Sequence, residues 1–158
     1  MSIENVISAI EYIDERGLER KYLQDENAVN IEQVEEVEGQ LEFVFPDSYR
    51  FFLLNYGFGD FEGLEFYGLV DGNNNYEGIE NAFWYTKELR RDAFFPVDLF
   101  VIESLGDGTE ACLNLTMMEN NECPVVLFDT GCPDDIYILA ESYGVYFYNR
   151  VQEAIKSL

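Results

Sequence analysis

The sequence contains no histidine in 158 residues. This absence excludes the serine and cysteine nucleophiles that depend on a histidine base, and it removes the commonest transition-metal ligand. The three cysteines, Cys112, Cys123 and Cys132, are too few for a four-sulfur zinc site, and none forms a CxxC pair. We expect reduced, mostly buried thiols, with a disulfide or a reactive thiol as the alternative. We expect neither a metal nor a cofactor.

Basic residues are scarce. Nine Lys and Arg face 32 Asp and Glu, which gives a formal net charge of −23. Two long segments, between Arg50 and Lys87 and between Arg91 and Arg150, contain no base. Such a charge repels nucleic acid and anionic lipid and attracts basic proteins. The alternative interpretation is that the acidity only keeps the domain dispersed in solution.

Long apolar runs are also lacking, since no stretch reaches the roughly 18 residues that a membrane helix needs. The first residues are acidic and do not resemble a signal peptide, so we expect a cytoplasmic protein. Hydrophobic residues make up 47% of the chain, enough for a core. We expect one domain over residues 1–158, because no linker or internal repeat divides the sequence.

Helical periodicity marks several segments. Apolar residues at steps of three and four, with capping residues before them and glycines after them, are the signal. In the segment beginning FPDSYRFFLLNYGFG, Pro46 or Asp47 is expected to start a helix, and Gly57 and Gly59 are expected to end it. In the segment before it, Gln33 lies three residues after Asn30, which is the spacing of a capping box. The expected helices cover 2–15, 30–45, 46–57, 77–93 and 142–158.

Short segments rich in β-branched and aromatic residues recur along the chain after residue 63. Asp107-Gly108 lies between two of them and predicts a hairpin turn. The expected strands cover 64–70, 99–104, 109–115, 124–129 and 135–140. We therefore predict an α+β fold, with a mixed, mainly antiparallel sheet packed against several helices.

Basic and acidic residues are distributed differently over these expected helices and strands. Every base lies in or just beyond an expected helix, whereas the strands and their loops carry acids alone. If the helices cover one side of the sheet, its free face and loops form a negative surface. The candidate partner-binding acids in loops and at strand ends are Asp60, Glu62, Glu65, Asp107, Glu110, Asp134 and Asp135. No nucleophile–base pair accompanies them, so we expect no enzyme; a hydrolase with two carboxylates is the least favoured alternative.

The order of these motifs resembles the SUKH superfamily, whose founding members are the fungal Smi–Knr regulators of cell-wall synthesis. The resemblance covers residues 30–156. Phe45 stands where the family has leucine, and Phe58 separates the two glycines, which leaves the packing roles intact. The residues that match the family's helix motif are Pro46, Tyr49, Phe52, Leu53, Asn55, Gly57 and Gly59.

The resemblance implies a scaffold without a catalytic set. Bacterial members of the superfamily serve as immunity proteins that bind and block a cognate toxin, frequently a nuclease. A nuclease has a basic cleft for phosphates, which an acidic protein can cover, so we expect a basic toxin domain as the partner. The alternative is a regulatory adaptor of the Smi–Knr type. The oligomeric state stays open.

Overall fold

The computed structural model describes residues 2–91 and 94–158. In chain order, the helices are α1 (Ser2–Glu15), the 3-10 turn η1 (Asp25–Asn27), α2 (Ile31–Leu41), α3 (Asp47–Asn55), α4 (Ala82–Leu89) and α5 (Tyr143–Lys156). The strands are β1 (Gly59–Phe61), β2 (Leu64–Phe66), β3 (Leu99–Gly106), β4 (Thr109–Asn114), β5 (Val125–Asp129) and β6 (Tyr137–Ala140). The fold is α+β, as predicted.

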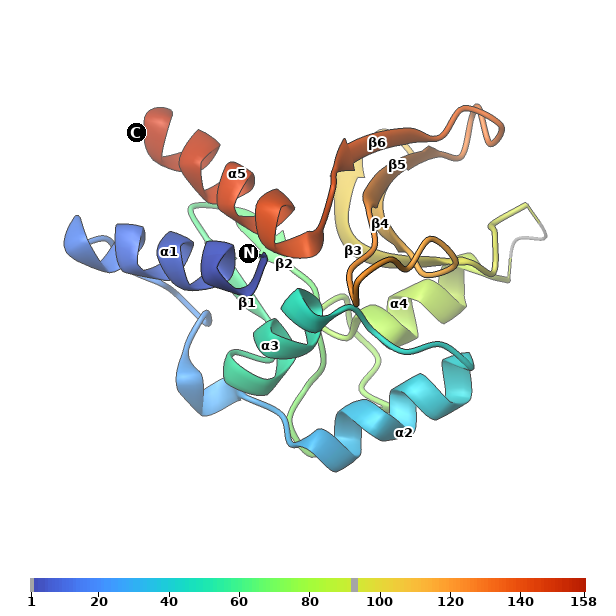
Figure 1. Cartoon of the computed structure of the whole chain (residues 1–158), viewed down its shortest axis with the longest axis horizontal. Coiled ribbons are helices and arrows are strands. Elements are labelled where there is room, and N and C mark those ends of the chain that lie inside the picture. Colours follow the sequence, from blue (N-terminus) through green and yellow to red (C-terminus); the bar gives the residue numbers. More distant parts are fainter. Residues whose placement is uncertain (1, 92–93) are drawn as a thin grey trace.

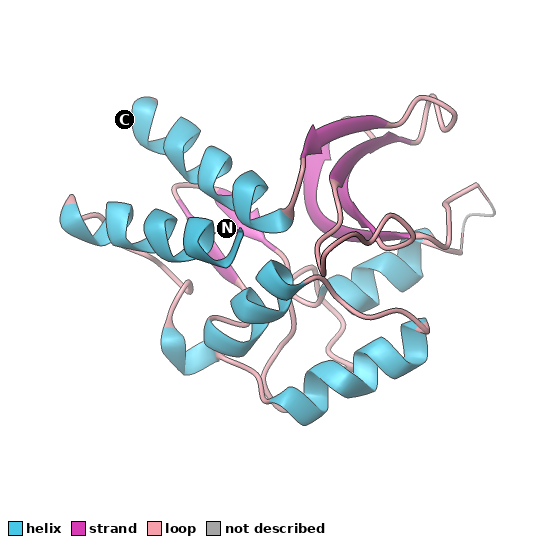
Figure 2. Cartoon of the chain, in the orientation of Figure 1, coloured by secondary structure: helices cyan, strands magenta, loops and turns pink. Residues whose placement is uncertain are grey.

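The strands form two antiparallel sheets rather than one. β1 and β2 make a small hairpin, and the other strands form a sheet in the order β3-β4-β5-β6. Figure 1 shows α1 and α5 side by side, with α3 beneath them and α4 beside the larger sheet. That sheet is strongly curved, as Figure 2 shows. The expected strand at 64–70 is shorter than predicted, and β1 was not predicted. Parallel contacts occur only as isolated bridges in the described chain, such as Gly68 with Asn81.

The expected helix at 77–93 is also shorter. α4 begins after Asn81, whose side chain accepts hydrogen bonds from the backbone N–H groups of Phe83 and Trp84. The amide of Asn81 donates to the carbonyls of Asn74 and Tyr76, so this residue also holds the preceding loop. Residues 92 and 93, at the end of the expected helix, lie outside the described residues. A capping asparagine therefore begins this helix five residues later than its periodicity suggests.

α2 confirms half of the predicted capping box. Asn30 Oδ1 accepts a hydrogen bond from the Gln33 backbone N–H at 2.8 Å. The side chain of Gln33 does not return to Asn30. Its amide donates to Val70 O and Asn74 Oδ1, and its Oε1 accepts from Gly72 N. Gln33 therefore fixes the loop at residues 70–74 against α2, a tertiary role that its spacing alone does not indicate.

The N-terminus of α3 is capped from far along the chain. Pro46 is at the cap position, and its side chain makes no cap bond. Instead Glu122 accepts from the Ser48 backbone N–H at 2.9 Å and from Ser48 Oγ at 2.8 Å. Asp47 is the first helical residue, and its N–H donates to Asn121 O. A carboxylate here also complements the positive end of the helix.

The two glycines after α3 have different roles. Gly57 has φ +75° and ends the helix as predicted. Gly59 does not have a left-handed angle; it lies in β1, where a Cβ would collide with Leu23. Gly59 is therefore required by close packing of the chain after α1, not by helix termination.

The central strands are buried on both faces. Residues 99–103 of β3 and 110–113 of β4 are all buried. Phe100 packs against Phe45 and Tyr49 on one side, with ring centroids at 4.9 and 5.9 Å. On the other side, Phe128 of β5 contacts Phe95 at 5.1 Å. The prediction of a free, negative sheet face is therefore wrong: helices and loops cover both faces, and only strand ends and β6 remain exposed.

Candidate partner-binding site

The seven predicted site residues do not form one cluster. Asp60, Glu62 and Glu65, which we call the hairpin acids, lie on β1, β2 and the turn between them. Asp107, Asp134 and Asp135, which we call the turn acids, lie in the turns after β3 and β5 and are all exposed. Figure 1 shows the hairpin beside α5 and the β5–β6 turn at the far end of the larger sheet. The seventh residue, Glu110, belongs to neither group.

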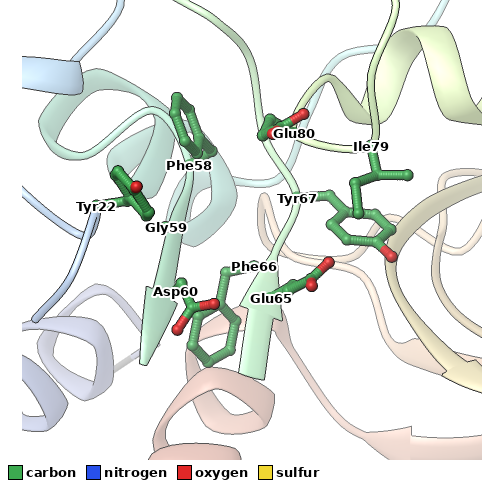
Figure 3. Close-up of a pocket in the computed structure, with 9 residues that line it drawn as sticks. All are labelled: Tyr22, Phe58, Gly59, Asp60, Glu65, Phe66, Tyr67, Ile79 and Glu80. Carbon is green, nitrogen blue, oxygen red and sulfur yellow. The ribbon is translucent and has the colours of Figure 1, made fainter. Parts of the chain in front are cut away.

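Two of the hairpin acids, Asp60 and Glu65, border a pocket of about 410 Å³. Asp60 and Glu65 are cross-strand partners, so their side chains share one face of the hairpin. Figure 3 shows both carboxylates at one end of the pocket and Glu80 at the other. Three carboxylates near the exposed Tyr22 ring form a receptor suited to a Lys or Arg side chain of a partner, which gains both ion pairing and contact with a ring face.

The aromatic wall of this pocket was missed at the sequence level. Tyr22 is more than half exposed, and it comes from the loop after α1. Phe58 stands beside it in Figure 3, and Tyr67 and Ile79 face them from the opposite wall. A large exposed tyrosine with φ +58° is the one local anomaly here, and it shows only in the structure.

Two facing carboxylates also invite a hydrolytic interpretation. Acid–base chemistry by such a pair requires that one carboxyl be desolvated, so that it holds a proton. Glu65 is exposed and Asp60 only half-buried, so the pair lacks that environment. The arrangement therefore serves electrostatic binding better than proton transfer.

The turn acids come together through a contact between two turns. Asp107 and Gly108 have φ of 53° and 78°, as the predicted tight hairpin turn requires. Thr130 N donates to Gly108 O at 3.0 Å, which joins the β3–β4 turn to the turn that carries Asp134 and Asp135. The three carboxylates therefore occupy the same end of the sheet, together with Asp129.

Glu110 corrects the predicted set. It lies within β4 and is only 4% exposed. Its Oε1 accepts from Tyr85 OH at 3.1 Å and from Ser104 Oγ at 3.4 Å, whereas Oε2 has no hydrogen-bond partner. Burial raises the pKa of the Glu110 carboxyl above its ordinary value, and the two hydroxyls offset part of that rise. Glu110 is thus unavailable to a partner. In the sheet it lies opposite the buried Phe128 of β5.

The six remaining acids take part in no salt bridge within the described ranges. Four arginines form salt bridges with other carboxylates, three of them on helices and one on β3. Their pairs are Arg20–Asp14, Arg50–Glu38, Arg91–Glu88 and Arg150–Glu103. Most of the molecule's arginine charge is therefore locally neutralised, whereas the negative charge of the hairpin and turn acids is not neutralised by a salt bridge in the described chain.

In the structure, basic residues lie closer to the strands than the sequence pattern suggests. Arg150 of α5 reaches Glu103 on β3 and lines a hollow that also includes Glu65. Lys21 accepts a backbone hydrogen bond from Asp60 and places its ammonium near the Tyr22 ring. The hairpin acids thus have two bases nearby, and the turn acids are the more purely negative group.

The cysteines are free thiols, as expected. Cys112 and Cys123 are buried, and Cys132 is exposed in the β5–β6 turn. Burial raises the pKa of Cys123 to about 12 and that of Cys112 well above its ordinary value, so neither is a reactive thiolate. Over residues 2–91 and 94–158, no group of His, Cys, Asp and Glu is placed to hold a metal ion. No helix in the same residues is long and apolar enough to cross a membrane.

The architecture defines an α+β scaffold with two small antiparallel sheets, a helical layer and acidic loops. The model of the family SUKH_5, described as SMI1-KNR4 cell-wall, matches residues 3–152, and the chain belongs to this family. The match begins earlier than the resemblance seen at 30–156, because it includes α1. The structure explains this extension: α1 packs along α5, so the N-terminal helix is an integral part of the domain.

Proposed function

We propose that this protein is an immunity protein that neutralises a basic toxin, most simply a nuclease domain, by stoichiometric binding. The observation that carries the proposal is that six carboxylates on the hairpin and turns, all exposed except the half-buried Asp60, lack any salt bridge in the described chain, whereas four arginines are paired. Unpaired charge of one sign is suited to meeting charge of the other sign on a partner. Membership of SUKH supports the proposal, since proteins of this family are commonly immunity proteins.

The two acidic groups have complementary parts in this proposal. The turn acids project from a sheet end without bases and provide long-range attraction. The pocket beside Asp60 and Glu65 provides an anchor point, where a partner's Lys or Arg fits between carboxylates and rings. Electrostatic attraction raises association rates by roughly two to three orders of magnitude at low salt, and buried anchors set the dissociation rate. Both features are needed to capture a toxin before it acts.

Charge reversal tests the proposal. One variant replaces the hairpin acids Asp60, Glu62 and Glu65 with Lys, and a second replaces the turn acids in the same way. A third carries Glu32, Glu35 and Glu36→Lys on the exposed face of α2 and serves as a control with the same change in net charge. The measurements are growth rescue on co-expression with the toxin encoded beside this protein, and association rates at several salt concentrations.

We expect the first two variants to associate at least about tenfold more slowly at low salt than the α2 control, with the difference shrinking as salt screens the charges. Equal slowing in all three would show that only net charge matters. If none is slowed, the electrostatic part of the proposal is wrong. If the unaltered protein gives no rescue, the immunity function itself is wrong, and the regulatory alternative, to which the family's cell-wall description points, takes its place.

A further inference from the structure

β6 is an edge strand with no backbone partner on its outer side. It pairs with β5 from Val125–Ala140 to Leu127–Tyr137, with an irregularity at Leu139. Among the described residues, no backbone hydrogen bond joins 136–140 to any segment except β5. The opposite edge is not open in this way. Tyr67 N donates to Ile102 O on β3, and Thr86 Oγ1 accepts from Val101 N.

The open edge is also apolar. Ile136, Tyr137, Ile138 and Leu139 are all exposed, Ile138 to 65%. Proteins usually protect an exposed edge strand with lysine, proline or a covering segment, because such an edge invites another strand to pair with it. Residues 136–140 contain neither lysine nor proline, and in Figure 1 β6 borders the sheet without a covering element. An edge kept apolar and open is suited to adding a strand.

The charged residues around β6 indicate which kind of strand can pair with it. Asp134 and Asp135 precede the strand and Glu141 follows it. If two copies of this protein paired through β6 in antiparallel fashion, the aspartates of one would face the glutamate of the other. Parallel pairing would also place acid beside acid, and like charges directly opposite each other destabilise a sheet. With a net charge of −23 on each copy, a second copy is the wrong occupant.

We propose that β6 accepts an extended segment of a basic partner protein, which adds a fifth strand to the sheet and places Lys or Arg beside Asp134, Asp135 and Glu141. Main-chain hydrogen bonds to β6 supply affinity that is largely independent of sequence. Alternate apolar side chains of the added strand lie against Tyr137 and Ile138 on the two faces. This inference rests on the proposed function for its partner, since it names how a basic toxin would dock.

The test uses the full chain and a synthetic probe. The probe is a peptide of alternating threonine and valine flanked by lysine pairs, added at millimolar concentration to isotopically labelled protein and followed by NMR. One control peptide has glutamate in place of lysine, and another has proline at its centre, which removes a strand hydrogen bond. We expect amide shifts concentrated in residues 136–140 with the lysine-flanked probe and little change with either control.

Protein variants complete the test. Ile138→Lys places an edge lysine on β6, and Val44→Lys is the matched control, because Val44 is 64% exposed and makes the same change of charge elsewhere. We expect Ile138→Lys to weaken binding of the probe by about tenfold or more and Val44→Lys to leave it nearly unchanged. No shifts at 136–140, equal binding of the glutamate peptide, or equal effects of both variants would overturn the inference. A dimer formed through β6 would overturn it as well.

The two proposals can fail separately. If the probe binds at β6 but the protein gives no rescue from the toxin, the inference about the open edge is supported and the proposed immunity function is wrong. If the unaltered protein and Ile138→Lys restore growth equally well at limiting expression, the proposed immunity function is supported and the toxin does not dock at the β6 edge.

Discussion

Carboxylates that are close in sequence occupy opposite environments in this protein. Glu103 and Glu110, on the central strands, are buried and bonded to side chains. Asp107, in the turn between those strands, is exposed and in no salt bridge that the described chain contains. The difference shows that a count of 32 acids overstates the binding surface. Some of these carboxylates hold the fold together, and we propose that those on the turns and the hairpin meet a partner.

Glu103→Ala should have the largest effect. Glu103 accepts from Tyr146 OH at 2.5 Å and from Nη2 and Nε of Arg150, at 2.7 and 3.1 Å. Its removal leaves a tyrosine hydroxyl and an arginine without their acceptor, so we expect a loss of about 3 kcal/mol in the free energy of unfolding by urea. Glu153→Ala is the matched control, since it removes the exposed partner of the same arginine at 3.4 Å. A loss below about 0.5 kcal/mol is expected there. Equal losses would contradict the distinction.

Glu110→Gln should have an intermediate effect that depends on pH. Because burial raises the Glu110 pKa in the folded state, the neutral carboxyl stabilises the fold at pH values below its ordinary pKa of 4.5. This contribution is lost as the pH rises through the higher folded-state pKa. Glutamine is neutral throughout, so the stability of the variant relative to the original protein should increase from acidic to neutral pH. Urea unfolding at several pH values measures this difference, and a constant difference would show that Glu110 is not desolvated.

Asp134→Asn together with Asp135→Asn should have the smallest effect on stability. Both side chains are exposed, so the free energy of unfolding should change by no more than about 0.5 kcal/mol, in the stabilising direction where repulsion is relieved. The same variant should still slow association with a basic partner at low salt. Destabilisation beyond that range would place these turn acids with the structural carboxylates and remove them from the binding surface.

The element types were largely predictable because each has a local cause. The periodic apolar residues of α1, α2, α3 and α5 and the Asp107-Gly108 turn depend on neighbours in sequence, and the structure confirms them. Element lengths were less predictable. The strand expected over 64–70 ends at Phe66, because Tyr67 and Gly68 instead bond to β3 and to the segment before α4.

Glycine roles show the same limit. Gly144 reads from the sequence as a weak point in the first turn of the last helix. In the structure a Cβ at this position would collide with the Ser2 carbonyl, and the Gly144 N–H donates to Ser2 Oγ and Ser48 Oγ. The glycine is there because three helix ends meet, which no local pattern reveals. Gly59 is required by Leu23 for the same kind of reason.

The sequence by itself determined the class of fold, the family motif around Pro46 and the large negative charge, because propensity, capping and composition act over a few residues or over the whole chain. Only the tertiary structure decided which carboxylates a partner can reach. Burial and pairing depend on segments far apart in sequence: α4 covers Glu110, α5 brings Arg150 to Glu103, and the loop after α1 brings Tyr22 beside Asp60. The open edge at β6 likewise follows from the order of the strands, which is set by packing of the whole domain.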